Sequence, residues 1–99
     1  MDLQQVTERL KGRVGEDCGL GARVKFDFGD GGVILIDASK MPNEVSNQDQ
    51  EADCTLSIAL EDFIAIGEGE LDAMTAFMLG KLKVAGDMGL AMRLQKIFK

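Results

Sequence analysis

Two stretches of strict alternation between apolar and polar residues constrain the fold of this chain most. In residues 22–28, valine and phenylalanine alternate with arginine, lysine and aspartate, and in residues 54–58, cysteine, leucine and isoleucine alternate with threonine and serine. Successive side chains of a strand point to opposite faces, so both segments are predicted to be strands with one apolar face. A sheet of such strands needs helices over its apolar face and leaves the other face to water. The sequence therefore predicts an α+β domain.

The remaining segments supply the other elements of such a domain. A capping-box-like start at Asp2 and Gln5 predicts a first helix that ends near Gly15. Turn-forming glycines in residues 29–32 join the strand at 22–28 to a strand at 33–36 that is apolar on both faces. Further helices are predicted at residues 60–67, 72–79 and 88–98, and further strands at residues 44–46 and 81–85. With 99 residues, the chain 1–99 is expected to be one domain.

The composition excludes several classes of function. The chain has no histidine, which removes Ser-His-Asp triads, Cys-His pairs and histidine-ligated metals. Seventeen acidic against eleven basic residues give a net charge of −6, and there is no tryptophan or tyrosine, which disfavours a nucleic-acid partner. We expect a protein that is not an enzyme and needs no cofactor.

The two cysteines, Cys18 and Cys54, are too far apart for a CxxC motif and too few for a disulfide scaffold, so both are predicted to be reduced thiols of a cytoplasmic protein. No apolar run is long enough for a membrane span. Cys54 is the first candidate nucleophile, but the alternation of its strand places it on the apolar face, where a thiol is inert. The acids of residues 49–53 resemble the opening of a calcium loop. The glycine and glutamate that such a loop needs later are absent, so no metal site is predicted.

Acidic residues dominate the middle of the chain. Between Lys40 and Lys81 there is no basic residue, while nine acidic residues fall between Glu44 and Asp72. This segment is predicted to be a solvated acidic flank. The alternative is a docking face for a basic protein partner.

Methionines gather near the C-terminus, where four of the six fall within residues 74–92. They are either ordinary core or the lining of an adaptable apolar pocket, because methionine repacks around varied shapes. The last predicted helix has an apolar stripe that includes Leu90, Leu94 and Ile97, with basic residues opposite. It is interpreted as a removable lid or as a transient contact with an anionic membrane. Helix-dipole complementarity also explains its basic residues without any function.

Three parts of the sequence resemble the sequences of a known protein family. Residues 80–95, Gly-Lys-Leu-Lys-Val-Ala-Gly-Asp-Met-Gly-Leu-Ala-Met-Arg-Leu-Gln, closely resemble the closing strand and helix of the sterol carrier protein 2 (SCP2) domain family. Ala52-Asp53-Cys54-Thr55, followed by Asp62-Phe63, resembles the preceding strand and helix, and residues 21–36 fit the opening hairpin more loosely. The chain ends Ile97-Phe98-Lys99 rather than in the small-basic-Leu tripeptide of peroxisomal members. A free-standing, bacterial-type, cytoplasmic member is therefore expected.

The resemblance implies a five-stranded, mostly antiparallel sheet with helices over one face and a hydrophobic tunnel between them. Family members bind and transfer fatty acids, fatty acyl-CoA, phospholipids or sterols and catalyse nothing themselves. Animal members typically have Phe-Gln where this chain has Met78-Leu79, so a hydroxylated ligand such as a sterol has one polar partner fewer. The tunnel residues implied here are Phe63, Ile66, Met74, Phe77, Met78, Leu79, Leu82, Val84, Met88, Met92 and Leu94.

Two questions about the ligand remain open in the sequence. Lys81, Lys83 and Arg93 are candidates to meet a carboxylate or phosphate head group, although such bases are often simply solvated. The alternative to a carrier is an accessory module that presents a hydrophobic intermediate, such as an isoprenoid quinone precursor, to partner enzymes. In that case the acidic segment 44–72 would be the docking face. An enzyme that uses Cys54 is the third hypothesis.

Overall fold

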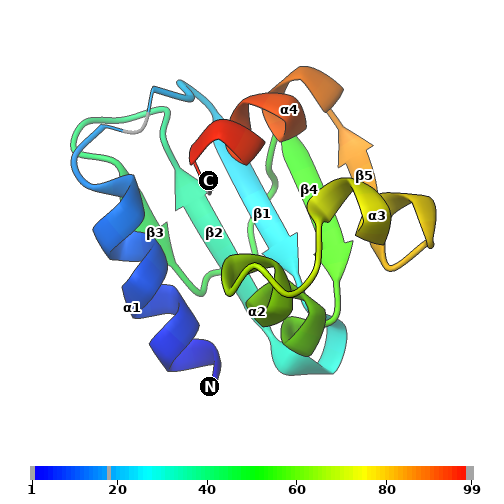
Figure 1. Ribbon diagram of the computed structural model, residues 1–99. Helices are drawn as coiled ribbons and strands as arrows, with labels where there is room; N and C mark the ends of the chain where they lie inside the picture. The colour runs from blue at the N-terminus through cyan, green and yellow to red at the C-terminus, as the bar shows by residue number, and fades with distance from the viewer. Residues whose placement is uncertain (1, 18, 98–99) are drawn as a thin grey trace.

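The computed structural model describes residues 2–17 and 19–97 and contains a five-stranded sheet with helices on one side (Figure 1). The strands lie in the order β3-β2-β1-β4-β5; β1 and β4 pair in parallel, and the other neighbours pair antiparallel. In chain order the elements are α1 (Leu3–Val14), β1 (Arg23–Asp27), the 3-10 helix η1 (Gly29–Gly31), β2 (Val33–Asp37), β3 (Glu44–Ser46), β4 (Cys54–Ile58), α2 (Leu60–Gly67), α3 (Ala73–Met78), β5 (Leu82–Gly86) and α4 (Met88–Ile97).

The predicted α+β class, the five strands and the four helices are confirmed, with bounds that differ by a residue or two. The predicted turn at residues 29–32 does join β1 to β2, and its residues 29–31 form a short 3-10 helix. The prediction that the last helix reaches Phe98 concerns a residue outside the described part of the chain.

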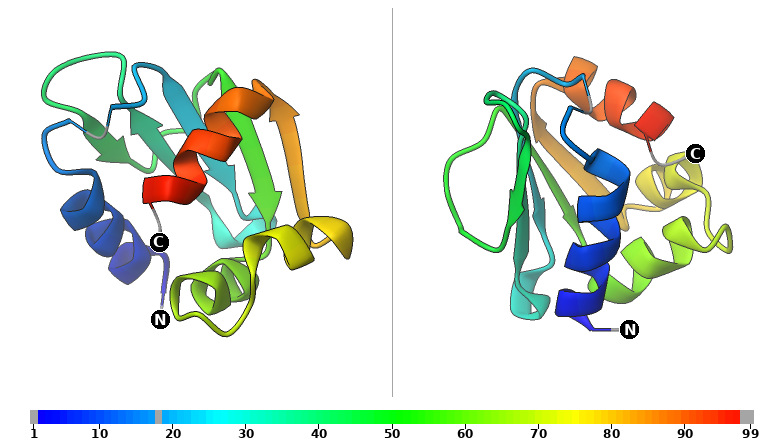
Figure 2. Two further views of the ribbon diagram at one scale, coloured as in Figure 1. Left: turned by 45° about the horizontal axis from the view of Figure 1, so that its top comes forward. Right: turned by 90° about the vertical axis from the view of Figure 1, so that its left-hand side faces the viewer.

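The core lies between the sheet and its helices. Register pairs Val24 of β1 with Ile36 of β2 and with Cys54 of β4, so that apolar side chains form continuous rows across the sheet. These three side chains are fully buried. Figure 2 shows all four helices on the same side of the sheet, as the alternation within the strands requires. From α4, Leu90 and Leu94 join this core, each no more than 4% exposed.

Helix α1 is fixed at its start and along one flank. Asp2 accepts a hydrogen bond from the backbone N–H of Gln5 while the Gln5 side chain accepts one from the backbone N–H of Asp2, a complete capping box. On the flank next to β3, the buried Thr7 hydroxyl accepts a hydrogen bond of 3.1 Å from the Asn47 side chain. This contact marks the side of α1 that lies against the edge of the sheet.

The face of the sheet away from the helices is less open than the alternation predicts. The connection between β3 and β4, residues 47–53, crosses outside this face (Figure 2, right). Leu35 of β2, which lies on this face, is only 2% exposed, and Lys25 of β1 forms an ion pair with Asp49 of the connection at 2.9 Å. The outer face that was predicted to meet water is therefore covered at this strap, because the chain must cross β2 and β1 to reach β4, and the burial of Leu35 agrees with the prediction that residues 33–36 are apolar on both faces.

Candidate functional site

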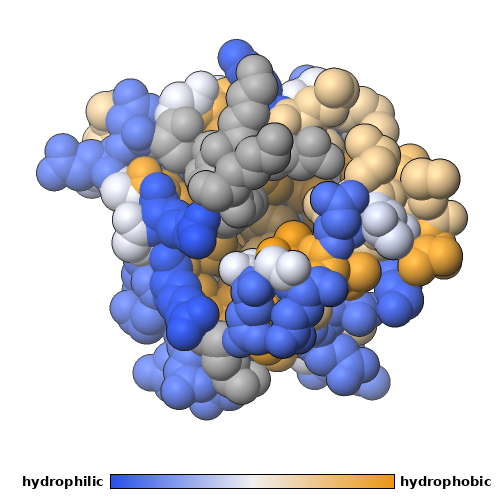
Figure 3. All heavy atoms as spheres, viewed as in Figure 1, coloured by the Kyte–Doolittle hydropathy of each residue, from blue (hydrophilic) through white to orange (hydrophobic). Residues whose placement is uncertain are grey.

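An apolar hollow lies on the helix side of the sheet and is the candidate functional site. We use "central hollow" for the space between α1, α2, α3 and α4 above β1, β4 and β5. Figure 3 shows apolar surface recessed there, with polar side chains of α1 and α2 along its border. The ring of Phe63 from α2 lies over the strands, with its centre 4.9 Å from that of Phe26 and 5.3 Å from that of Phe28. Aromatic contacts at these separations are favourable, so they hold α2 against the sheet.

Four of the predicted tunnel residues are half-buried on elements that surround this hollow. Phe63 and Ile66 of α2 and Leu82 and Val84 of β5 are half-buried and pack against the core. They are therefore neither sealed in the core nor fully in water. Leu94, by contrast, is 3% exposed and belongs to the core cluster itself.

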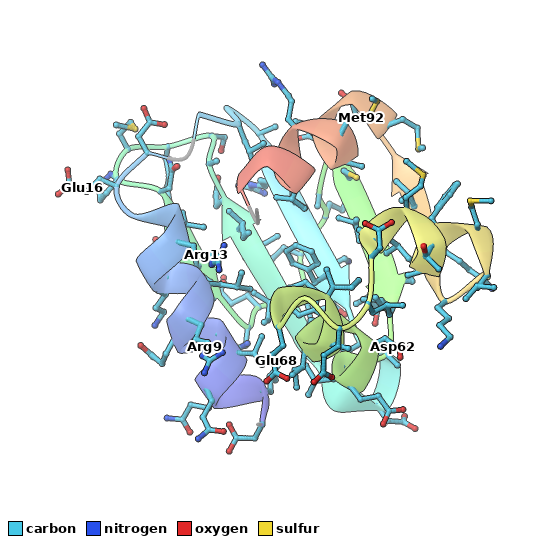
Figure 4. All side chains as sticks on the ribbon, in the orientation of Figure 1. Arg9, Arg13, Glu16, Asp62, Glu68 and Met92 are labelled. Carbon is cyan, nitrogen blue, oxygen red and sulfur yellow. The ribbon has the colours of Figure 1, made fainter. Side chains whose placement is uncertain are left out.

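The other six predicted tunnel residues are exposed. Together they form what we call the methionine patch, on α3 and its C-terminal end and on α4 (Figure 4, where Met92 is labelled). Helix α3 has six residues, of which only Ala76 is buried, so most of its apolar side chains face outward. Their exposed fractions are Met74 54%, Phe77 44%, Met78 78%, Leu79 64%, Met88 50% and Met92 68%.

The three basic head-group candidates do not form one cluster, because Arg93 lies apart from Lys81 and Lys83. Lys83 alternates with Leu82 and Val84 and so lies on the outer face of the sheet. Lys81 and Lys83 line a hollow of about 340 Å³ at one end of the sheet, and Arg93 donates a 3.3 Å hydrogen bond to the backbone carbonyl of Leu20. The structure therefore does not bring these three bases together.

A second small hollow lies at the same end of the molecule. It has a volume of about 350 Å³ and lies where the start of α2 meets the β1–β2 connection. Its lining includes Phe28, Leu60 and Ile64, so this hollow is mainly apolar.

Charged residues that the sequence did not mark as tunnel or head-group residues lie around the central hollow. Arg9 and Arg13 project from α1, and Asp62 and Glu68 project from α2 (Figure 4). The signal was present in the spacing of Arg9 and Arg13, which are one helical turn apart and therefore share a flank of α1. Only the packing of α1 shows that this flank faces the hollow.

The thiol of Cys54 is fully buried in β4. Burial raises its pKa above the ordinary value of 9.0, and the nearby Asp87 carboxylate adds to the increase. A thiol in this state is a poor nucleophile at neutral pH. The other cysteine, Cys18, lies outside the described residues.

The part of the chain that the structure describes also bears on metal binding and on membrane insertion. There, no group of three or more cysteine, aspartate or glutamate side chains is arranged to hold a metal ion. In the same residues, no helix has the length and apolar character needed to cross a bilayer.

Comparison with sequence families and curated relatives shows which known proteins this chain resembles. The model of the SCP-2 sterol transfer family matches residues 4–99. Human sterol carrier protein 2 is 49% identical over 51 residues, which are 52% of this chain and 9% of the human protein. Rat hydroxysteroid dehydrogenase-like protein 2 is 37% identical over 70 residues, 69% of this chain and 13% of the relative. The chain thus spans about a tenth of the length of these relatives.

Solved structures of other proteins share the arrangement of helices and strands over almost the whole chain. The sterol carrier protein domain 2 of Helicoverpa armigera has 26% identity and a TM-score of 0.76, over 95% of this chain and 83% of that one. Sterol carrier protein 2 like 2 of Aedes aegypti superposes with a TM-score of 0.78 at 24% identity, over 95% and 94% of the chains. The ubiquinone synthesis protein UbiJ-SCP2 has a TM-score of 0.71 at 15% identity, over 96% of this chain and 94% of that one. The last two likenesses concern the fold alone.

Proposed function

Because the chain belongs to the SCP-2 sterol transfer family, we propose that it is a lipid carrier that encloses fatty acids, fatty acyl-CoA or related lipids in the central hollow. The observation that carries this proposal is that Phe63 and Ile66 of α2 and Val84 of β5, on elements around the hollow, are half-buried apolar residues packed against the core. Sites for small molecules are mostly apolar and concave, with few polar groups. The proposed activity is binding and transfer without catalysis, which agrees with the absence of histidine and the burial of Cys54.

The driving force for such binding is removal of the acyl chain from water. Each buried CH2 group contributes ~0.8 kcal/mol, so a sixteen-carbon chain gives roughly 12 kcal/mol of gross stabilisation. The costs of immobilising the ligand and ordering the side chains around it reduce this figure substantially. Binding in the micromolar range or tighter is compatible with this balance.

In this proposal, the predicted tunnel residues have two different roles. The half-buried group on α2 and β5 lines the hollow, with Leu94 behind it in the core. The methionine patch borders the entrance, where flexible, unbranched side chains adapt to ligands of different width. Leu79 is 64% exposed at the end of α3, so it contributes apolar surface to this entrance and no polar partner for a sterol hydroxyl.

Displacement of a fluorescent fatty acid tests the proposal. Palmitate is expected to compete at micromolar concentration, and Ile66→Gln is expected to weaken binding because it places a polar amide in the apolar lining. Met41→Gln is the matched control, since Met41 is 68% exposed and lies in the connection between β2 and β3. Failure of every acyl ligand to compete at tens of micromolar would contradict the proposal.

The methionine patch also supports transient contact with a lipid surface during loading. Its exposed apolar side chains flank the basic residues Lys81 and Arg93, in a chain that is otherwise acidic. We propose that α3 and α4 meet the membrane through this patch. Replacement of both Met78 and Met92 by aspartate is expected to reduce co-sedimentation with vesicles of phosphatidylcholine and phosphatidylglycerol. Unchanged sedimentation would place the contact elsewhere.

The second candidate function is an accessory module that presents a hydrophobic intermediate to partner enzymes. The supporting observations are the shared fold with a ubiquinone synthesis protein and the exposed acids Glu61, Glu68 and Glu70 along the segment 44–72. Native mass spectrometry separates the alternatives. A carrier retains lipid through purification, whereas a docking module without a lipid of its own does not.

A further inference from the structure

The last strand of the sheet, β5, has an unpaired edge. It ends the strand order β3-β2-β1-β4-β5, and in the described part of the chain no segment pairs with its outer side. The opposite edge of the sheet differs, because β3 has only 3 residues and α1 packs beside it. An exposed edge strand offers free N–H and C=O groups to another strand. The edge of β5 is therefore the place where this sheet can be extended.

The pairing of β5 with β4 fixes which residues carry these free groups. Asp87 donates its backbone N–H to the Asp53 carbonyl at 2.9 Å, and the register of the two strands continues from this pair. Directly opposite residues of an antiparallel pair alternate between those that exchange hydrogen bonds and those that do not. The backbone groups of the odd-numbered residues of β5 therefore face β4, and those of Leu82, Val84 and Gly86 point to the free edge.

The free groups match a second copy of the same strand. Two antiparallel copies of β5, related by a two-fold axis at Val84, place Val84 opposite itself and Leu82 opposite Gly86. These are the residues whose backbone groups point outward, so each free N–H along the strand meets a carbonyl of the other copy. Gly86 has no side chain and leaves room for Leu82 across the pair.

The charges along this edge are complementary in the same register. Lys81 falls opposite Asp87 of the second copy at each end of the pair, and Lys83 falls opposite Ala85. All three charged residues are exposed, and none of them forms an ion pair within the described part of the chain. An axis at Leu82 instead sets Lys81 against Lys83, and like charges directly opposite are destabilising. The charges therefore select the central axis.

The methionine patch lies beside this edge. Helix α3 precedes β5 and α4 follows it, and both contact β5 on the same side of the sheet (Figures 1 and 2). Apart from Met41, the patch contains every large apolar side chain that is exposed among the described residues. Exposed apolar patches mark interaction surfaces. Antiparallel pairing of β5 brings α3 of one copy next to the start of α4 of the other, so apolar side chains of the two patches can leave water together.

We propose that the β5 edge is a dimerisation surface whose partner is a second copy of this chain, paired antiparallel about Val84. The sheet then continues across both copies, with all helices on one side. The paired strand has 5 residues and each copy carries a net charge of −6, so the dimer is weak, in the micromolar range. This inference goes beyond lipid carriage and does not depend on it.

Sedimentation equilibrium tests the dimer over an about hundredfold range of protein concentration. Lys81→Glu creates a like-charge pair at each end and is expected to weaken the dimer about tenfold. Adding Asp87→Asn removes this repulsion while keeping a capping side chain for α4, and is expected to restore part of the affinity. Lys11→Glu makes the same charge change on α1 and is the matched control, with an expected change of less than about twofold. Circular dichroism verifies that each variant folds.

Disulfide formation tests the register itself. In a pair that does not exchange hydrogen bonds, Cα atoms lie about 4.5 Å apart, which is within the range of a disulfide. A mixture of Lys83→Cys and Ala85→Cys proteins, each also carrying Cys18→Ala, is expected to form linked dimers faster under mild oxidation than either protein alone. Lys83→Cys mixed with Glu44→Cys, on the opposite edge strand β3, gives the rate of random collision.

The proposal requires three results together: a wild type that dimerises as its concentration rises, a weaker dimer for Lys81→Glu, and fast cross-linking of the Lys83→Cys and Ala85→Cys mixture. A wild type that stays monomeric throughout the range rejects it. A dimer that Lys81→Glu leaves unchanged rejects it as well, because the contact then lies elsewhere. Cross-linking of the mixture no faster than the Glu44→Cys control rejects the antiparallel register about Val84.

Discussion

At the scale of single residues, Gly86 at the end of β5 carries an unusual structural demand. Its φ is 98°, and a Cβ atom built there would lie 2.3 Å from the backbone carbonyl oxygen of Asp53. The backbone cannot withdraw easily, because the Asp53 carbonyl also accepts a hydrogen bond from the N–H of Asp87 at 2.9 Å. Glycine is therefore required where β5 turns into α4.

Gly86→Ala is expected to destabilise the fold by more than about 2 kcal/mol, because left-handed strain of about 1–2 kcal/mol is combined with a backbone clash. Gly80→Ala is the matched control: its φ is 77°, but nothing lies within 4 Å of the added Cβ. It should show the strain alone. Urea denaturation of both variants measures the difference in the free energy of unfolding, and equal losses would contradict the argument.

Among the carboxylates that the structure describes, Asp37 at the end of β2 has a lowered pKa. The main cause is the hydrogen bond from the Ser39 hydroxyl, supported by the Ser39 backbone N–H and by Arg23 and Lys40, while burial partly opposes the shift from the ordinary value of 3.8. A folded-state pKa below the unfolded value means that the ionised carboxylate stabilises the fold above about pH 4. This stabilisation is lost as the pH falls through the folded-state pKa.

Ser39→Ala is expected to raise the pKa of Asp37 toward its ordinary value and to flatten the loss of stability on the acid side of pH 4. Carboxyl-carbon NMR titration reports the pKa, and urea denaturation at several pH values reports the stability. An unchanged pKa in this variant would mean that the Ser39 contacts are not the main cause of the shift.

At the scale of secondary-structure elements, the α4 helix is part of the core and not a detachable cover. The sequence interpretation of a removable lid rested on its terminal position and its apolar stripe. In the structure, α4 contacts β4 and β5, and Leu90, Ala91 and Leu94 are buried against the sheet. A chain that ends at Gly86 is therefore expected to lose core packing as well as lipid binding.

Leu94→Ala is expected to cost about 2–5 kcal/mol of stability, the usual range for leucine deletions in a packed core. Met92→Ala, two residues away on the exposed side of the same helix, should change stability by less than about 0.5 kcal/mol. Thermal or urea denaturation compares the two. A small loss for Leu94→Ala would return α4 to the role of a lid.

The elements themselves were predictable, and their arrangement was less so. Alternation in β1 and β4 and the capping box of α1 are local signals, so the sequence contains them directly. The family resemblance supplied the mostly antiparallel sheet, but no local signal indicates that residues 47–53 cross the outer face. The apolar run at 33–36 indicates that Leu35 is buried, but which segment covers it depends on a long-range connection that periodicity does not encode.

At the scale of the whole molecule, the apolar hollow and the charges around it define the candidate site. The sequence identified the apolar residues of this region but could not separate those that line the hollow from those left exposed on α3 and α4. Both groups are apolar, and only packing shows that Val84 is half-buried while Met78 is exposed. Arg9 and Arg13 were overlooked because solvated arginines on a helix are common, and their position depends on how α1 docks.

Methyl NMR during a titration with palmitate tests the central claim most directly, because it reports both whether lipid binds and where. The account predicts saturable shifts at the methyl groups of Ile66, Leu82 and Val84, with one lipid per protein. Leu35, buried on the outer face, should keep its position and serves as the internal reference. Absence of shifts, or shifts centred on Leu35 and the strap instead of the central hollow, would contradict the account.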